Sequence, residues 1–199
     1  WDDKMVIGDG YTVNVSSDVG FGYNHGLAMS GTARLTSTGN IDLTGLNPAS
    51  LVVTGGSFDA GKAFSVAGPN QMKADVTAGS LSLGTGPTFQ ITGTMVSRGA
   101  VSINSGATVV GSVSGTAITT ESPFRVTGDV TATDTLLVAS QGTIEGAVVG
   151  NTSITINSPA TLSKSVTSQG PVMIGSGANI GGVVKGTTIT ADSPVTLNS

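Results

Sequence analysis

Apolar residues return along much of this chain with a period of about 18 residues. The clearest column takes steps of 17 or 18 from one member to the next: Ile91, Val109, Val126, Ile144, Leu162, Ile180 and Leu197. Three more columns keep this period: Met95, Val113, Val130, Val148, Val166 and Val184; Leu83, Val101, Ile118, Leu136, Ile154, Val172 and Ile189; and Ile103, Val138, Ile156 and Ile174, with Thr120 and Ala191 in the same register. A short repeat of constant phase is typical of a solenoid, in which each coil places like residues above like.

The pattern predicts an all-β fold, a single-stranded β-solenoid (β-helix) with about 18 residues per coil. The 199 residues would then make roughly eleven coils. Parallel strands stacked about 4.8 Å apart would give a stiff rod roughly 50 Å long.

The regularity of the period divides the chain into three segments. Residues 1–30 are predicted to be an irregular N-terminal cap or docking segment, since the aromatic residues Phe21 and Tyr23 gather there. Residues 31–86 are predicted to be irregular solenoid coils with variable loops, and residues 87–199 regular 18-residue coils. The residues expected to point inward in the irregular coils are Leu35, Ile41, Leu43, Leu51, Val53, Phe58, Phe64, Val66, Val76, Leu81 and Leu83.

Within the regular segment, two coils form a larger repeat of 35 or 36 residues. A Gly-x-Val-x-Gly unit recurs at residues 111–115, 146–150 and 182–186. A Ser-Pro pair recurs at Ser122-Pro123, Ser158-Pro159 and Ser193-Pro194, with a related Pro87 one larger repeat earlier. Glycine and proline belong at the corners of a coil. Glycine allows two backbones to approach closely, and proline has no backbone N–H to donate to a neighbouring strand.

In the column from Val109 to Ile180, the position six residues after each member is small or polar. These positions are Gly115, Ala132, Gly150, Ser168 and Gly186. A left-handed hexapeptide solenoid would need a large aliphatic side chain there, so the phase does not fit that class.

The Gly-x-Val-x-Gly units and the coil length resemble those of bactofilins, the polymer-forming β-solenoids of bacteria. The pattern is also similar to stalk-like solenoids in bacterial adhesins and pilus-associated surface proteins. This resemblance covers about residues 87–199 and lies in the style of the repeat. Bactofilins are typically richer in charge, whereas Thr, Ser, Gly and Asn dominate here, which favours a surface or extracellular protein.

Composition agrees with a β-rich chain and excludes several partners. The chain has 30 glycines, 38% hydrophobic residues, 10% charged residues and no cysteine, so disulfides and thiolate metal sites are excluded. The net charge is −4 and the 8 Lys and Arg residues are dispersed, which argues against nucleic-acid binding. No apolar run approaches the roughly 20 residues of a membrane helix, so we expect no membrane span.

Candidates for catalysis are few. The chain has one histidine, His25, in a Gly-rich loop, where a surface loop residue is the plainer interpretation than a general base. The carboxylates that a glycan-cleaving β-helix would need in pairs are spread out: Asp42, Asp59, Asp75, Asp129 and Asp134. We interpret them as solvated edge charges that discourage strand-to-strand aggregation. The prediction is no enzyme, with no catalytic, cofactor-binding or metal residues assigned and no cofactor.

Two further sites remain open at this stage. Asp2, Asp3 and Asp9 would form a calcium site if they converged with backbone carbonyls, although a charged cap is the simpler interpretation. An ice-binding face would need an unbroken threonine ladder. Thr119, Thr155 and Thr190 recur at two-coil steps, but Leu137 and Met173 occupy the coils between them.

The predicted function is therefore a non-catalytic structural or adhesive β-solenoid of the bacterial surface or an extracellular filament: a stalk, a filament subunit or an adhesin module. The alternative is a bactofilin-like scaffold that polymerises without nucleotide in the cytoplasm, associated with the membrane. A carbohydrate-active β-helix would need more aromatic surface than Trp1, Tyr11, Phe21 and Tyr23 supply.

The expected partners are a second copy of the chain, further domains, and a host-surface or glycan ligand. The final residues motivate the first two, because Val195 and Leu197 are still in phase and no capping segment follows them. A bare last coil would expose strand edges beside an apolar core, which is a template for end-to-end association.

Overall fold

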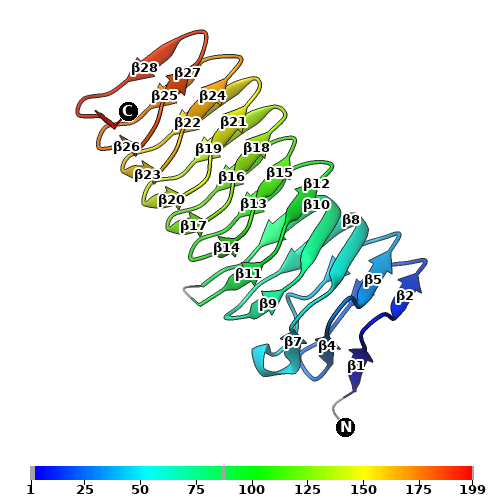
Figure 1. The fold of residues 1–199 in the computed structure, drawn as a ribbon. Coiled ribbons are helices and arrows are strands. Elements are labelled where there is room, and N and C mark those ends of the chain that lie inside the picture. Colours follow the sequence, from blue (N-terminus) through cyan, green and yellow to red (C-terminus); the bar gives the residue numbers. More distant parts are fainter. Residues whose placement is uncertain (1–2, 87, 199) are drawn as a thin grey trace.

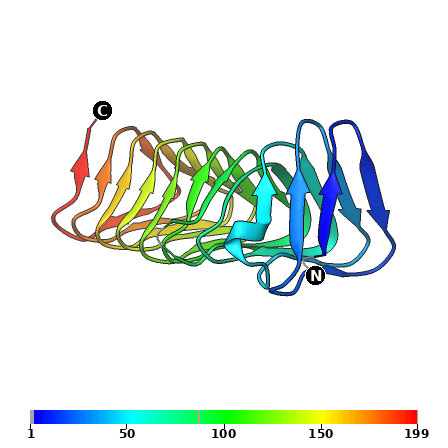
Figure 2. The same cartoon turned by 90° about the horizontal axis from the view of Figure 1, so that it is seen from below.

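The computed structural model describes residues 3–86 and 88–198, and these residues wind into a parallel β-solenoid of about eleven coils (Figure 1). The first and last coils of the described residues lie at opposite ends of an elongated body (Figure 2). Each coil contributes strands to three faces around one apolar core, and every pair of neighbouring strands is parallel. The prediction of an all-β solenoid with about 18 residues per coil is confirmed.

The first face is an eleven-stranded sheet. Its strands, in spatial order, are β1 (Lys4–Ile7), β4 (Gly26–Met29), β7 (Leu51–Val53), β9 (Gln71–Lys73), β11 (Gln90–Thr92), β14 (Thr108–Val110), β17 (Phe124–Val126), β20 (Gly142–Ile144), β23 (Ala160–Leu162), β26 (Asn179–Ile180) and β29 (Thr196–Leu197). A short 3₁₀ helix, η1 (Pro48–Ser50), precedes β7.

The second and third faces share two long strands, β8 (Ser57–Val66) and β10 (Asp75–Leu83), which bend from one face into the next. The second face contains β2 (Thr12–Val15), β5 (Arg34–Ser37), the first halves of β8 and β10, β12 (Met95–Ser97), β15 (Val113–Gly115), β18 (Val130–Ala132), β21 (Val148–Gly150), β24 (Val166–Ser168) and β27 (Val184–Lys185). The third contains β3 (Val19–Gly20), β6 (Ile41–Asp42), the second halves of β8 and β10, β13 (Val101–Ile103), β16 (Ile118–Thr120), β19 (Thr135–Val138), β22 (Ser153–Ile156), β25 (Val172–Ile174) and β28 (Ile189–Ala191).

The apolar columns of the sequence are the core. Consecutive members of the Ile91 column are register partners on the first face, and all of them from Ile91 to Ile180 are buried. Leu197 pairs with Ile180 but is 56% exposed, because no coil covers it among the described residues. All eleven inward residues predicted for the irregular coils are buried as well, so alternation alone identified them.

One column was predicted with the wrong first member. Leu83 pairs with Ile103, and it is Leu81 that pairs with Val101. The coil between β10 and β13 is two residues longer than the 18-residue period, since Leu81 and Val101 are 20 positions apart. Leu83 therefore belongs to the column of Ile103, Val138, Ile156 and Ile174.

Glycine at the corner between the first and second faces allows the backbones of successive coils to approach closely. A Cβ on Gly128 would lie 2.4 Å from the carbonyl carbon of Gly111, and a Cβ on Gly111 would lie 2.0 Å from the carbonyl oxygen of Gly93. Real side chains do not tolerate such contacts, so the stacking of these coils requires glycine. The small residues Gly115, Ala132, Gly150 and Ser168 end the second-face strands, next to the following corner.

The corner between the third and first faces explains the larger repeat of two coils. Ser122-Pro123, Ser158-Pro159 and Ser193-Pro194 are cis peptides at this corner in alternate coils. In the coil before each of these peptides, a residue with positive φ takes the corner: Gly106, Gln141 and Gly177. The N–H groups of these three residues donate to the carbonyls of Pro123, Pro159 and Pro194. The related Pro87 lies outside the described residues.

A charge placed in the core tests this architecture. Ile144 is fully buried between Val126 and Leu162, so Ile144→Asp would place an unpaired carboxylate in an apolar interior. We expect a loss of unfolding free energy on the order of 4 kcal/mol, measured by denaturant titration. Thr143→Asp, on the same strand but facing outward, is the matched control and should change stability little. Equal stability of the two variants would contradict the assigned core.

Candidate functional site

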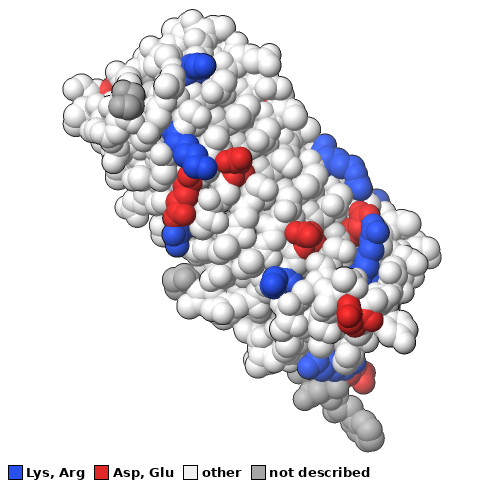
Figure 3. Space-filling view, in the orientation of Figure 1, with Lys and Arg blue, Asp and Glu red and all other residues white. Residues whose placement is uncertain are grey.

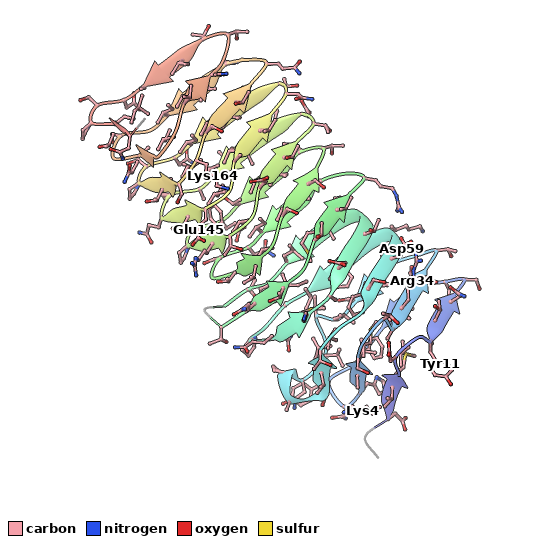
Figure 4. All side chains as sticks on the ribbon, viewed as in Figure 1. Lys4, Tyr11, Arg34, Asp59, Glu145 and Lys164 are labelled. Carbon is pink, nitrogen blue, oxygen red and sulfur yellow. The ribbon has the colours of Figure 1, made fainter. Side chains whose placement is uncertain are left out.

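A groove on the second face is the candidate site, and the charged residues Asp59 and Arg98 are part of its lining. Asp59 on β8 accepts from Arg34 Nη2 on β5 at 2.9 Å through one oxygen, and from Arg98 Nη2 at 3.4 Å through the other. Arg34 and Asp59 lie side by side on neighbouring strands (Figure 4). Asp59 is about 29% exposed, whereas the two arginines are about half exposed, so the carboxylate lies beneath them.

The groove has a volume of about 590 Å³ and crosses the first three coils of the second face. Its lining consists of Asn14, Val15, Ser16, Thr36, Ser37, Thr38, Asp59, Gly61 and Arg98, and we call it the second-face groove. Thr36 Oγ1 donates to Asn14 Oδ1, so the Asn14 amide nitrogen remains as the donor end of that side chain. The groove therefore offers donors and acceptors on a mostly uncharged floor.

Sequence reasoning did not find this groove. It treated Asp59 as one of several isolated carboxylates, because Arg34 and Arg98 are 25 and 39 positions away from it. The signal becomes visible only when the register is known. Arg34 then pairs with Ser57, two residues before Asp59, and Arg98 follows β12 two coils further along the rod.

The other predicted carboxylates do not come together. Asp75 begins β10 and Asp129 immediately precedes β18, and each accepts a backbone N–H of the next coil at 2.7 Å, from Thr94 and Ala147 respectively. Asp42 accepts from the N–H and hydroxyl of Thr44 in a local turn. Asp42, Asp75 and Asp129 are exposed, as expected for solvated charges, and each also makes a defined hydrogen bond, whereas Asp59 is partly buried. Asp134 follows β18, on the opposite side of the strand's sequence from Asp129, and it is exposed.

Asp9 and Asp18 also use their side-chain carboxylates to accept hydrogen bonds from the next coil, as Asp75 and Asp129 do. Asp18 accepts the N–H of Asn40 at 2.7 Å, and Asp9 accepts both the N–H and the hydroxyl of Thr32. The backbone and side-chain hydrogen bonds from Thr32 lower the pKa of Asp9 below its ordinary value of 3.8. The stabilisation from this carboxylate is therefore complete above the ordinary pKa and is lost as the pH falls through the lowered one.

Of the three residues considered for calcium binding, Asp3 and Asp9 make hydrogen bonds within the solenoid. The Asp9 carboxylate is used by Thr32, Asp3 accepts Gly26 N–H through its backbone carbonyl, and Asp2 lies outside the described residues. Among residues 3–86 and 88–198, no group of three or more His, Asp or Glu side chains is arranged to hold a metal ion.

His25 stabilises a local turn. Its Nδ1 accepts the N–H of Gly22 at 3.0 Å, and its own N–H donates to the Gly22 carbonyl at 3.0 Å. The side chain is exposed, as expected for a loop residue. Of the aromatic residues near this end, Phe21 packs against the core, while Tyr11 and Tyr23 are exposed and Trp1 lies outside the described residues.

The register confirms that the threonine ladder is interrupted. On the third face Thr119 pairs with Leu137, Leu137 with Thr155, Thr155 with Met173, and Met173 with Thr190. Met173 is 55% exposed, so an apolar side chain stands between two threonines on the surface.

Charged side chains form small, separate groups on the face shown in Figure 3, and most of the surface there is uncharged. Besides the Asp59 contacts, Arg125 pairs with Glu145 on the first face. No helix in the described part of the chain is long and apolar enough to cross a membrane.

These features define the chain as a parallel β-solenoid repeat protein with one polar groove as its candidate site. Comparison with known protein families, curated sequences and solved structures gives no match.

The coil-to-coil carboxylates can be tested with a matched pair of variants. Asp129→Ala removes the acceptor of the Ala147 N–H and should cost about 1 kcal/mol of unfolding free energy. Asp134→Ala, at the other end of the same strand, should cost less, since its side chain makes no hydrogen bond within the described residues. Denaturant titration at neutral pH measures both, and a larger loss for Asp134→Ala would overturn the assignment.

Proposed function

We propose that this protein is a non-catalytic structural rod of the bacterial surface or of an extracellular filament, acting as a stalk, filament subunit or adhesin module. The observation that carries this proposal is the continuous core. One buried residue in every coil from Ile91 to Ile180 stacks directly on the next, so the chain specifies length and stiffness.

The distribution of charge supports a structural rather than a catalytic role. Of the carboxylates considered for catalysis, Asp75 and Asp129 join successive coils and Asp59 is held by two arginines. Hydrolysis of glycosidic bonds usually requires two carboxyl groups facing one substrate bond. Asp59, Asp75 and Asp129 instead link neighbouring coils, and Asp42 bonds within a local turn.

The surface composition supports an exposed location. The outward positions are mainly Thr, Ser, Gly and Asn, and only 10% of residues are charged. The absence of cysteine is compatible with either an oxidising or a reducing compartment. A bactofilin-like polymerising scaffold is the second candidate, because an uncovered solenoid end would allow polymerisation at the cell surface and in the cytoplasm alike.

The coil of residues 181–198 presents an uncovered end. Ile189 is 48% exposed and Leu197 is 56% exposed, although both continue columns that are buried in earlier coils. The outer edges of β27, β28 and β29 also have no strand beside them among the described residues. We propose that further parallel strands cover this end, either from a second copy of the chain or from adjoining protein. Head-to-tail contact between copies does not close and would produce filaments.

Association of the 199-residue chain tests this proposal. Light scattering across a wide concentration range should show growing species, and Leu197→Lys should shift growth to at least tenfold higher concentration by placing a charge in the joint. Thr196→Lys, the outward-facing neighbour on β29, is the matched control. A species that stays monomeric at every concentration, or equal effects of the two variants, would contradict end-to-end self-association.

A further inference from the structure

We propose that the second-face groove binds an acidic saccharide, with a sugar carboxylate against Arg98 and the hydroxyls against the polar floor. This goes beyond the rod function, because it assigns a ligand to one place on the rod. It holds whether or not the chain associates end to end.

The shape of the groove follows from the residues at one corner of the solenoid. The residues that follow Val15, Ser37, Ala60, Ala78 and Ser97 form a column at the corner between the second and third faces. That column reads Ser16, Thr38, Gly61, Gly79 and Arg98. The two glycines contribute no side chain between Thr38 and Arg98, which leaves room for a ligand there.

Both glycines are required by the stacking of the coils. A Cβ on Gly61 would lie 2.4 Å from the carbonyl oxygen of Thr38, and one on Gly79 would lie 2.5 Å from the carbonyl oxygen of Lys62. The absence of side chains at these two corner positions therefore follows from the stacking of the backbone. Its volume of about 590 Å³ falls within the usual range for small-molecule sites.

The charges around the groove favour an anion. Asp59 is shared by Arg34 and Arg98, so these three groups carry a net charge of +1. Lys62 follows Gly61 at the same corner and is exposed, which adds positive charge at the edge of the groove. This local balance is opposite in sign to the net charge of −4 of the whole chain.

Asp59 orients Arg98 without using all of its donors. The contact involves only Nη2 of Arg98, at 3.4 Å. A guanidinium has five N–H donors in a planar fork, so the second Nη2 hydrogen, together with either Nε–H or Nη1–H, remains for a planar carboxylate. A carboxylate ligand would be bound in the two-point geometry for which arginine is better suited than lysine.

The remaining lining suits sugar hydroxyls. Ser16 and Thr38 are exposed hydroxyls, and the Asn14 amide nitrogen is available because Thr36 already donates to its Oδ1. These short side chains lie on two successive coils, whose strands β2 and β5 pair in register. Donors and acceptors repeated along the rod match a chain of sugar residues better than a single small anion.

Calorimetric titration at low ionic strength with a tetramer of galacturonate tests the proposal on the full 199-residue chain. The wild type should bind, and Arg98→Gln should weaken binding about tenfold or more. Arg98→Lys should fall between the two, because it keeps the charge but loses the planar fork. The matched control is Arg125→Gln, which removes an equally exposed arginine–carboxylate contact on another face and should leave binding unchanged.

Three probes distinguish the acidic saccharide from other ligands: the methyl-esterified tetramer, inorganic phosphate, and a single-stranded oligonucleotide. The proposal predicts that all three bind at least tenfold more weakly than the tetragalacturonate. No binding of the tetramer, equal binding of any of these probes, or an equal loss on Arg125→Gln would overturn it. Arg98→Gln should leave the melting temperature and light scattering unchanged, since an exposed ion pair contributes little stability. Failure of this proposal is thus separable from failure of the rod function.

Discussion

Each coil of this protein is bound to the coils before and after it by parallel main-chain hydrogen bonds, and that bonding fixes the phase of the sequence. A shift by one residue would turn a strand's buried side chains outward, so the apolar column and the hydrogen-bond ladder must agree in every coil. The corners obey the same constraint. Glycine occurs where backbones stack too closely for a Cβ, as at Gly111 and Gly128, and carboxylates such as Asp75 and Asp129 bond to the next coil.

Much of this architecture could be predicted from the sequence, because the constraint is periodic. The column from Ile91 to Ile180 and the alternating residues of the early coils are buried as expected. Leu83 was assigned to the wrong column because one coil is 20 residues long, and a local change in coil length leaves no mark in a composition or an average period. The second-face groove was missed for a related reason. Its charged residues come from separate coils, and only the register shows that Arg34 and Arg98 both reach Asp59.

The division between buried and outward positions also explains why the fold was easier to predict than the function. Inward residues must match their neighbours in every coil, whereas outward residues such as Leu137 and Met173 vary without disturbing the ladder. The rod therefore provides a rigid surface on which single positions can acquire a binding role. At the second-face groove, two corner glycines create the space and an arginine from a later coil reaches back to Asp59, and neither feature alters the core.

The in-register stacking of coils is tested most directly by engineered cross-linking, since the native chain has no cysteine to interfere. Thr143 and Thr161 are register partners on adjacent strands of the first face, at a spacing that a disulfide can bridge. We predict that the double variant Thr143→Cys, Thr161→Cys forms an intramolecular disulfide rapidly on mild oxidation. The pair Thr143→Cys, Ser163→Cys, offset by two residues, should not. Equal cross-linking of the two variants, or none in the first, would contradict the account.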